Sequence, residues 1–362
     1  MRRSAALALL VLPAAATACG AAAPSRAPSR SCPATARQEL VAVARRIYDQ
    51  SVSGPNEVDA VARLHRSAAL TRAVAARNPR AIRAALIPVI HNRIVRIDVA
   101  AGGRTLVRVG TAPALAPVRG LIGGGMGRYV LSVGDQHSFE AITRGLTGAA
   151  VRFGGTGGVS FPAQTFPGTS TRVHLALPAR PAVDCADARV GAIGLVGRNL
   201  IDAETRGASA QMALHHAAGS RPFRRAIAAG NPAAVRAAII RFFRDSRFHI
   251  VRVRAWRGSH LITDVGGPFV ISPARATIPG IGRFVLSVQD DTGYIKLIHR
   301  FTGADVVLHA GPRTVPGSNL FPGPPYTPGL TTVTYGGRTY TAYGFTAPAF
   351  PSGALQVSLL VP

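Results

Sequence analysis

The densest group of polar side chains in this 362-residue sequence lies between residues 289 and 300. Carboxylates here could accept hydrogen bonds from an amine, while the cations that follow could face a carboxylate. The residues concerned are Asp290, Asp291, Tyr294, Lys296 and Arg300. The segment predicts either the polar rim of a ligand pocket or, because Asp and Gly are turn formers, a turn that links two strands.

A second candidate for ligand binding is an expected strand that carries Arg252, Arg254 and Trp256 at alternate positions. Alternate residues of a strand project from one face of a sheet. A stripe of two arginines and a tryptophan is costly to bury, so it lines a polar cavity or lies in solvent. The matching positions in the first half of the chain, Arg96 and Asp98, form a weaker stripe. Of the two halves, we therefore expect the second to bind.

The sequence shows no arrangement of residues typical of catalysis. It contains no G-x-S-x-G motif, and the glycine-rich run Gly123–Gly127 lacks the Lys-Ser/Thr pair of a phosphate-binding loop. His215 and His216 are adjacent on an expected helix, whereas zinc ligands on one helix face lie three or four residues apart. We therefore expect no enzymatic activity, no cofactor and no metal.

The positions of the cysteines favour one disulfide. Cys32 and Cys185 are 153 residues apart, and each precedes an expected helix. In an oxidising compartment the two can form a bridge; the alternatives are free thiols or intermolecular pairing. The third cysteine, Cys19, lies near the N-terminus.

The N-terminus predicts export. Two arginines at positions 2 and 3 precede the apolar stretch Leu7–Ala18, which is too short to span a membrane. Small residues followed by Cys19 resemble a bacterial lipoprotein signal, in which the cysteine becomes lipidated, although Ala16 replaces the usual leucine. The protein is thus expected to be extracytoplasmic and anchored to the cell membrane by lipid. The alternative is ordinary cleavage after Ala18 and secretion.

The rest of the chain repeats itself, which indicates duplication. Three pairs of segments match in order: Asn78–Pro79 with Asn231–Pro232, Gly127–Val133 with Gly282–Val288, and Phe166–Pro178 with Phe350–Pro362. The offset between copies grows from 153 to 155 and then to 184 residues, so the second copy contains an insertion. Each copy is long enough to bury its own core.

These observations predict the organisation of the chain. A signal peptide occupies 1–19, a flexible linker 20–35, a first module 36–178 and a second module 186–362, with a hairpin insertion near 326–347. The insertion contains β-favouring residues on both sides of Gly336-Gly337, which is typical of a hairpin turn.

Periodicity predicts an α+β fold. Leu40, Val43 and Ile47 have helical spacing, and Asn78 caps a second expected helix. After the second helix the spacing of apolar residues changes to two, which predicts a strand. Further strands are expected at Leu106–Val109, Tyr129–Val133, Phe139–Thr143 and Val173–Leu177. Each module should have N-terminal helices packed on an antiparallel sheet of about five strands.

The segments Ile94–Leu106 and Ile250–Ile262 resemble the first strand pair of the Cache, or PDC, extracellular sensor family. That resemblance implies two tandem profilin-like modules. The amine-binding motif of the family does not map onto this sequence, so no ligand residue is transferred. Family members usually carry a transmembrane helix and a cytoplasmic output domain. Since neither is evident here, we expect a stand-alone binding or accessory protein.

The formal net charge is +26, and Lys296 is the only lysine. Such a charge indicates an anionic partner or, alternatively, the codon usage of a GC-rich genome. The arginines are spread along the chain without interleaved aromatic residues, so no nucleic-acid partner is expected. The expected function is capture of a small molecule, and the alternative is non-enzymatic binding of anionic lipid or wall polymer. The sequence identifies no signalling or envelope partner.

Overall fold

The structure is a computed structural model that describes residues 32–90, 94–245, 248–350 and 352–362. The predicted signal peptide, Cys19 and most of the predicted linker lie outside these ranges. The fold is α+β with antiparallel sheets, as the sequence predicts. No helix within the described ranges is both long enough and apolar enough to cross a membrane.

The first half begins with four helices and continues into strands, with one further helix among them. In chain order the elements are α1 (Cys32–Ser53), α2 (Pro55–Arg66), α3 (Ala68–Ala75), α4 (Pro79–Ile90), β1 (Arg96–Ala101), β2 (Arg104–Val109), β3 (Ala114–Leu115), β4 (Val118–Ile122), the 3₁₀ turn η1 (Gly123–Gly125), β5 (Gly127–Ser132), β6 (Gly134–Asp135), α5 (Gln136–Thr147), β7 (Ala150–Phe153), β8 (Val159–Thr165) and β9 (Thr169–Ala176).

The second half repeats this order of helices and strands and adds β17 and β18. Its elements are α6 (Ala188–Arg206), α7 (Ala208–Gly219), α8 (Arg221–Ala229), α9 (Pro232–Arg244), β10 (Arg252–Arg257), β11 (His260–Gly266), β12 (Val270–Ile271), β13 (Ala274–Ile278), β14 (Gly282–Ser287), β15 (Gln289–Asp290), α10 (Asp291–Thr302), β16 (Asp305–Ala310), β17 (Arg313–Thr314), β18 (Gly329–Tyr335), β19 (Arg338–Phe350) and β20 (Gly353–Val361).

Corresponding strands occupy corresponding places in the sheets. The first half has the strand orders β2-β1-β5-β4 and β6-β3-β8-β9-β7. The second half has β11-β10-β14-β13 and β15-β12-β19-β20-β16-β17, and β18 pairs with β19. The register also corresponds, since Asp98 lies opposite Val130 and Arg254 lies opposite Val285. Gly336 and Gly337, both at positive φ, form the tight turn between β18 and β19.

Helix starts are specified by capping side chains that recur in both halves. The side chain of Asn78 accepts a hydrogen bond from the third residue of α4 at 3.1 Å, and Asn231 does the same for α9 at 3.0 Å. Asp135 caps α5 at 2.9 Å, and Asp290 caps α10 at 2.6 Å. Each cap satisfies a backbone N–H group that has no partner within its helix. The repeated caps fix where these helices begin in each half.

Two predicted local structures are wrong. Phe139–Thr143 is predicted as a strand but belongs to helix α5, because Phe139, Thr143 and Leu146 are buried at helical spacing and Gly148 ends the helix in a left-handed conformation. Likewise, residues 289–296 do not link two strands, since they form β15 and the first turns of α10.

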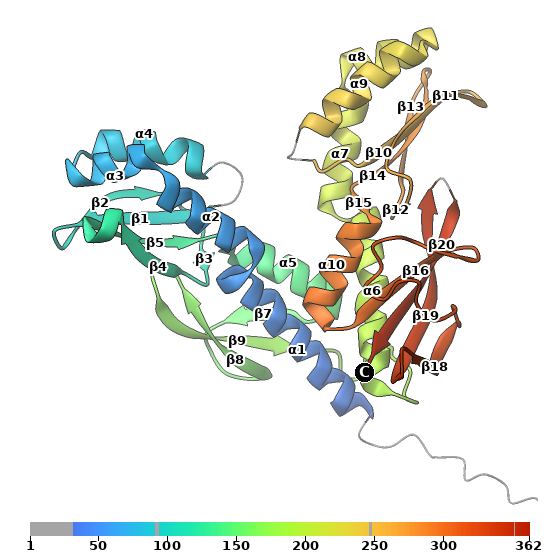
Figure 1. Cartoon of the computed structure of the whole chain (residues 1–362), viewed down its shortest axis with the longest axis horizontal. Helices are drawn as coiled ribbons and strands as arrows, with labels where there is room; N and C mark the ends of the chain where they lie inside the picture. Colours follow the sequence, from blue (N-terminus) through green and yellow to red (C-terminus); the bar gives the residue numbers. More distant parts are fainter. Residues whose placement is uncertain (1–31, 91–93, 246–247, 351) are drawn as a thin grey trace, which may run out of the picture.

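The hydrophobic interior is divided differently from the prediction of one core for each module. A single core joins both halves: it contains Leu40 of α1, Leu146 of α5, Ile193 of α6 and Ile298 of α10, together with strands of both five- and seven-stranded sheets. We call this region the central body. Its helices lie between its two sheets (Figure 1). Each long helix of the central body is therefore buried on two sides only when both halves of the chain are present.

Two smaller cores form arms that diverge from the central body (Figure 1). Arm 1 packs α2, α3 and α4 on the sheet β2-β1-β5-β4, and arm 2 packs α7, α8 and α9 on the sheet β11-β10-β14-β13. In each arm one face of the sheet is covered by helices, so the other face is available for side chains with a different role.

The predicted disulfide is confirmed. Cys32 and Cys185 are bonded, with their Cα atoms 5.6 Å apart. The bond joins the chain at the starts of α1 and α6, which begin at the same end of the central body (Figure 1). Closing a loop of 153 residues restricts the unfolded chain and thereby stabilises the fold.

Candidate functional site

The predicted stripe of two arginines and a tryptophan lies on strand β10, at the centre of arm 2. Val253 and Ala255, between the stripe residues, are fully buried beneath the helices of this arm. The alternation of a strand therefore directs Arg252, Arg254 and Trp256 to the opposite face of the sheet. This outcome follows from the period of two along β10.

A hollow of about 530 Å³ lies on this face of the arm 2 sheet. Its floor comes from β10, β13 and β14, and the end of the β19–β20 hairpin forms a wall with Pro348 and Phe350. We call it the arginine hollow. Its volume lies within the range of small-molecule sites.

Cross-strand pairing places the floor residues in two rows. In one row Arg254 lies opposite Val285 of β14, which in turn lies opposite Arg275 of β13. In the other row Trp256 lies opposite Arg283. Residues directly opposite each other in antiparallel strands are close neighbours, so the register places three arginines and one tryptophan on the same floor.

Two of the arginines at this face are held by one carboxylate. Asp264 of β11 accepts hydrogen bonds from Arg252 at 2.8 and 2.7 Å and from Arg254 at 2.6 Å. Burial would raise the pKa of Asp264, but the hydrogen bonds and charges of both arginines outweigh burial and hold the pKa below its usual value. Arg252 is buried and also lies over the ring of Phe350, 5.4 Å from its centroid. These contacts fix Arg254 at the edge of the hollow.

The other two arginines remain available. Arg275 and Arg283 are exposed, and neither forms an ion pair with another residue in the described ranges. Arg283 lies over the Trp256 ring, 5.5 Å from its centroid, a distance at which a cation is attracted to the face of the ring. With four arginines and one aspartate at this face, the local field attracts anions.

On the corresponding face of arm 1, two arginines contact the segment that follows β8. Arg96 lies over the ring of Phe166, 4.4 Å from the centroid, and Arg119 donates a hydrogen bond to the carbonyl of Pro167 at 3.1 Å. The charge pair is also reversed: Asp98 on β1 pairs with Arg108 on β2, where arm 2 has Arg254 and Asp264. Arg96 thus lies over Phe166 as Arg252 lies over Phe350, whereas Arg119 contacts Pro167 and its counterpart Arg275 faces the hollow.

The second predicted cluster lies away from the arginine hollow, on β15 and α10. Asp290 is the helix cap described above, and Asp291 is half-buried, so that burial raises its pKa. Tyr294 is fully buried and donates a hydrogen bond to the carbonyl of Gly197 in α6 at 3.2 Å. Burial also raises the pKa of Tyr294. This hydroxyl is therefore engaged within the central body.

The remaining two residues of that cluster point elsewhere. Lys296 is exposed on α10. Arg300 is exposed at the edge of a separate hollow of about 280 Å³ between α1, α5 and α10. Of the eight predicted binding residues, only Arg254 and Trp256 line the arginine hollow, and Arg252 lies beside it on the same strand.

Sequence analysis missed Arg275, Arg283 and Phe350. The segment that contains Arg283 was singled out only as a repeated motif, and the signal that could have marked it is an arginine facing outward in each strand of the β13–β14 hairpin. Phe350 could not be placed, because its contact with Arg252 depends on the approach of the central body to arm 2.

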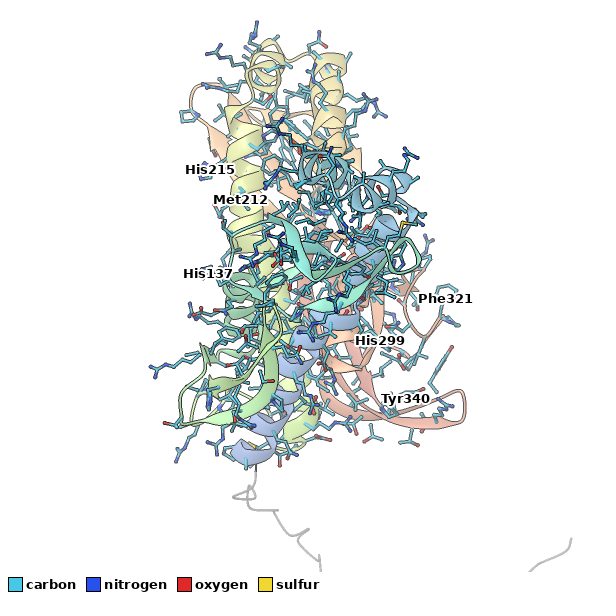
Figure 2. All side chains as sticks on the ribbon, turned by 90° about the vertical axis from the view of Figure 1, so that its left-hand side faces the viewer. His137, Met212, His215, His299, Phe321 and Tyr340 are labelled. Carbon is cyan, nitrogen blue, oxygen red and sulfur yellow. A yellow bond between two sulfur atoms is a disulfide. The ribbon has the colours of Figure 1, made fainter. Side chains whose placement is uncertain are left out.

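The adjacent histidines face different ways, as their spacing predicts. His216 stacks on Phe248 with ring centroids 4.1 Å apart, whereas His215 is exposed on the outer side of α7 (Figure 2). Across the described ranges, no group of three or more His, Cys, Asp or Glu side chains is placed to hold a metal ion.

No protein-family model matches this chain, and neither a curated protein nor a solved structure matches it. The resemblance to Cache sensors therefore remains a prediction from sequence. What can be said about function rests on the geometry and charge of the hollows themselves.

Proposed function

We propose that this chain is an extracytoplasmic, non-enzymatic binding protein whose arginine hollow captures a small organic anion. One observation carries the proposal: Arg275 and Arg283, two exposed arginines without ion-pair partners among the described residues, line a walled hollow together with Trp256. Guanidinium groups suit carboxylates and phosphates, which they can bind through two parallel hydrogen bonds.

The apolar residues that line the hollow indicate what the uncharged part of the ligand should be. Pro348 and Phe350 provide an apolar wall, and Trp256 provides a ring on the floor. A ligand with one anionic group and an apolar or planar body would satisfy both parts of the site. Small-molecule sites commonly combine an apolar lining with a few charged groups that fix orientation.

The repeated order of elements, caps and registers supports an origin by duplication, and we propose that the two copies diverged in ligand binding. In this account each copy derives from a Cache-like sensor module. A sheet covered by helices on one side, with ligand contacts on the other, is compatible with that derivation. No ligand residue is taken from the family.

The proposed location rests on the cysteines. The Cys32–Cys185 bond is of a kind that persists in oxidising compartments, and Cys19 lies in a lipoprotein-like signal. We propose that lipid on Cys19 tethers the protein to the outer face of the cell membrane.

Thermal-shift titration with carboxylates, phosphate monoesters and amino acids tests the binding proposal. A ligand that binds only the folded state raises the melting temperature in a saturable way. The rise should disappear in the double variant Arg275→Ala/Arg283→Ala, whose replaced side chains are exposed and outside the core. The matched control is Arg119→Ala/Arg128→Ala in arm 1, since these residues of β4 and β5 have the same register as Arg275 and Arg283 of β13 and β14. This variant should respond like the parent chain. A shift that survives the arm 2 variant, or no shift with any probe, would overturn the proposal.

A second candidate function is adhesion to an anionic polymer or lipid surface. The observation that favours it is the exposed side of α8 and α9, two helices that contain no acidic residue. Their exposed arginines are Arg221, Arg224, Arg225, Arg236, Arg241 and Arg244. Binding of this kind should weaken steeply as salt increases, and it should survive the variant Arg275→Ala/Arg283→Ala. Sedimentation with anionic vesicles and with wall polymer at rising salt measures both properties.

A further inference from the structure

A third hollow lies on the outer face of the seven-stranded sheet, partly enclosed by the segment between β17 and β18, which has no counterpart in the first half. Its volume is about 400 Å³. The floor comes from β16, β17 and β20, and the wall is the segment from Pro322 to Tyr326, which precedes the additional strand β18. We call it the histidine hollow.

Three polar side chains cross the floor in a row. His309 of β16 lies opposite Thr314 of β17 on one side and opposite Gln356 of β20 on the other. Leu308 and Val357, their neighbours in sequence, are fully buried in the central body. Because side chains alternate along a strand, the polar row must face outward, toward the hollow.

His309 is the centre of this row. The residue is only 5% exposed, and its Nε2 atom is buried without a hydrogen-bond partner among the described residues. Burial lowers the pKa of His309, so the ring is neutral at neutral pH. Buried polar groups nearly always have partners, so this ring nitrogen, in a residue that lines the hollow, has an unmet hydrogen bond that a ligand can supply.

The wall of the hollow is held in place by hydrogen bonds. The backbone N–H of Gly323 donates to the hydroxyl of Tyr335 at 3.2 Å, and the side chain of Asn319 accepts from Val306 at 2.9 Å. The hydroxyl of Thr314 donates to the carbonyl of Pro322. A wall fixed in this way does not have to be ordered when a ligand binds, which favours affinity.

The rim carries aromatic and proline rings. The Tyr326 ring lies 6.4 Å from His309, measured between ring centroids, and Pro322, Pro324 and Pro325 also line the hollow. Phe321, next to them, is 59% exposed and projects from the edge of the molecule (Figure 2). Flat apolar rings therefore surround a polar floor.

In contrast to the arginine hollow, no Arg, Lys, Asp or Glu of the described chain lines this one. An anion or a cation would find no counter-charge in it. From the neutral polar floor and the surrounding rings, we propose that the histidine hollow binds a neutral saccharide unit. Sugar hydroxyls both donate and accept hydrogen bonds, as the side chains of His309 and Gln356 do, and the C–H faces of a pyranose pack against aromatic and proline rings.

The test uses the full exported chain and named probes. These are glucose, galactose, arabinose and N-acetylglucosamine, each as the monosaccharide and as a β-linked tetramer. Saturation-transfer NMR detects binding and calorimetry measures it. We expect millimolar or tighter binding of at least one probe, weakened about tenfold or more by His309→Leu, which removes both ring nitrogens while preserving apolar volume.

Gln356→Leu is the second variant, since this half-buried side chain faces outward and its loss leaves the core intact. It should weaken the same probe, while Arg275→Ala/Arg283→Ala should bind as the parent chain does. Circular dichroism establishes that each variant is folded. If Phe321→Ala weakens only the tetramer, the natural ligand is a glycan chain; equal affinities for both lengths and no effect of Phe321→Ala indicate a free sugar.

Three results would overturn the proposal. One is the absence of binding by every probe at millimolar concentration. Another is binding that both floor variants leave unchanged. The last is that a proline-rich peptide, tested in parallel, binds the hollow in place of the sugars.

Discussion

The Asp264 carboxylate holds Arg252 and Arg254 on one face of the arm 2 sheet. Replacing it with an amide should therefore lower the free energy of unfolding of this arm. In Asp264→Asn, Arg252 stays buried at 9% exposed while three charged hydrogen bonds are lost or weakened. Breaking a buried ion pair costs about 3–5 kcal/mol, and because these side chains are partly exposed and the amide keeps one acceptor, we expect about 2–4 kcal/mol.

Arm 1 supplies a matched control. Asp98→Asn removes the reversed pair, in which Arg108 is 68% exposed and lies 3.3 Å from the carboxylate. Exposed pairs contribute about 0–1 kcal/mol, so this variant should lose far less stability. Hydrogen exchange read by mass spectrometry over β10–β11 and over β1–β2 reports the opening free energy of each arm separately. Equal losses in the two arms would refute the reasoning.

The same carboxylate predicts a dependence on pH. The pKa of Asp264 is lower in the folded than in the unfolded state, because Arg252 and Arg254 stabilise its charged form. Its contribution to the free energy of unfolding is therefore complete above the unfolded pKa and is lost as pH falls through the folded pKa. Asp264→Asn should abolish this part of the acid destabilisation of arm 2.

Three further changes have defined outcomes. Replacing Cys32 and Cys185 with serine should lower the free energy of unfolding by about 2–5 kcal/mol, measured by urea denaturation with and without reductant on the parent chain; no loss would contradict a role for the bond in stability. Tyr294→Phe removes the hydroxyl that donates to Gly197, so it should cost about 1 kcal/mol while leaving anion binding unchanged; a loss of binding would contradict its assignment to the core. Asp290→Ala removes a helix cap and should cost about 1 kcal/mol, seen as faster hydrogen exchange in the first turn of α10; unchanged exchange would contradict that role.

Much of the repeat could be predicted because its signals are local. Asn78 and Asn231 precede proline at helix starts, and such a cap acts through the next three residues. Cys32 and Cys185 are separated by 153 residues, the offset between the two copies, which similarly indicated that the two could meet. Helix caps and a constant offset between copies can be recognised in the sequence without knowing how the two halves pack.

The helices α5 and α10 were missed because their apolar residues fit two periods. Phe139, Ala141 and Thr143 alternate as in a strand, but burial follows Phe139, Thr143 and Leu146. Asp135, which caps α5, and Gly148, which ends it, are the residues that distinguish a helix from a strand here. The shared core was also not predictable, since contacts between halves leave no periodic signal.

Only one strand of the arginine hollow could be predicted from the sequence, and the other lining residues are brought together by the fold. The period of two along β10 places Arg254 and Trp256 on one face. The arrival of Arg275 and Arg283 beside them depends on the register of β13 and β14, which residue spacing alone does not fix.

Binding at the arginine hollow is the central claim, and the only tryptophan of the chain, Trp256, reports on it directly. Titration of the protein with benzoate, succinate and phenyl phosphate should change the Trp256 emission in a saturable way for at least one of them. The change should be lost in Arg275→Ala/Arg283→Ala and retained in Arg119→Ala/Arg128→Ala. Emission that none of these anions alters at millimolar concentration, or titrations that are the same in both variants, would contradict the account.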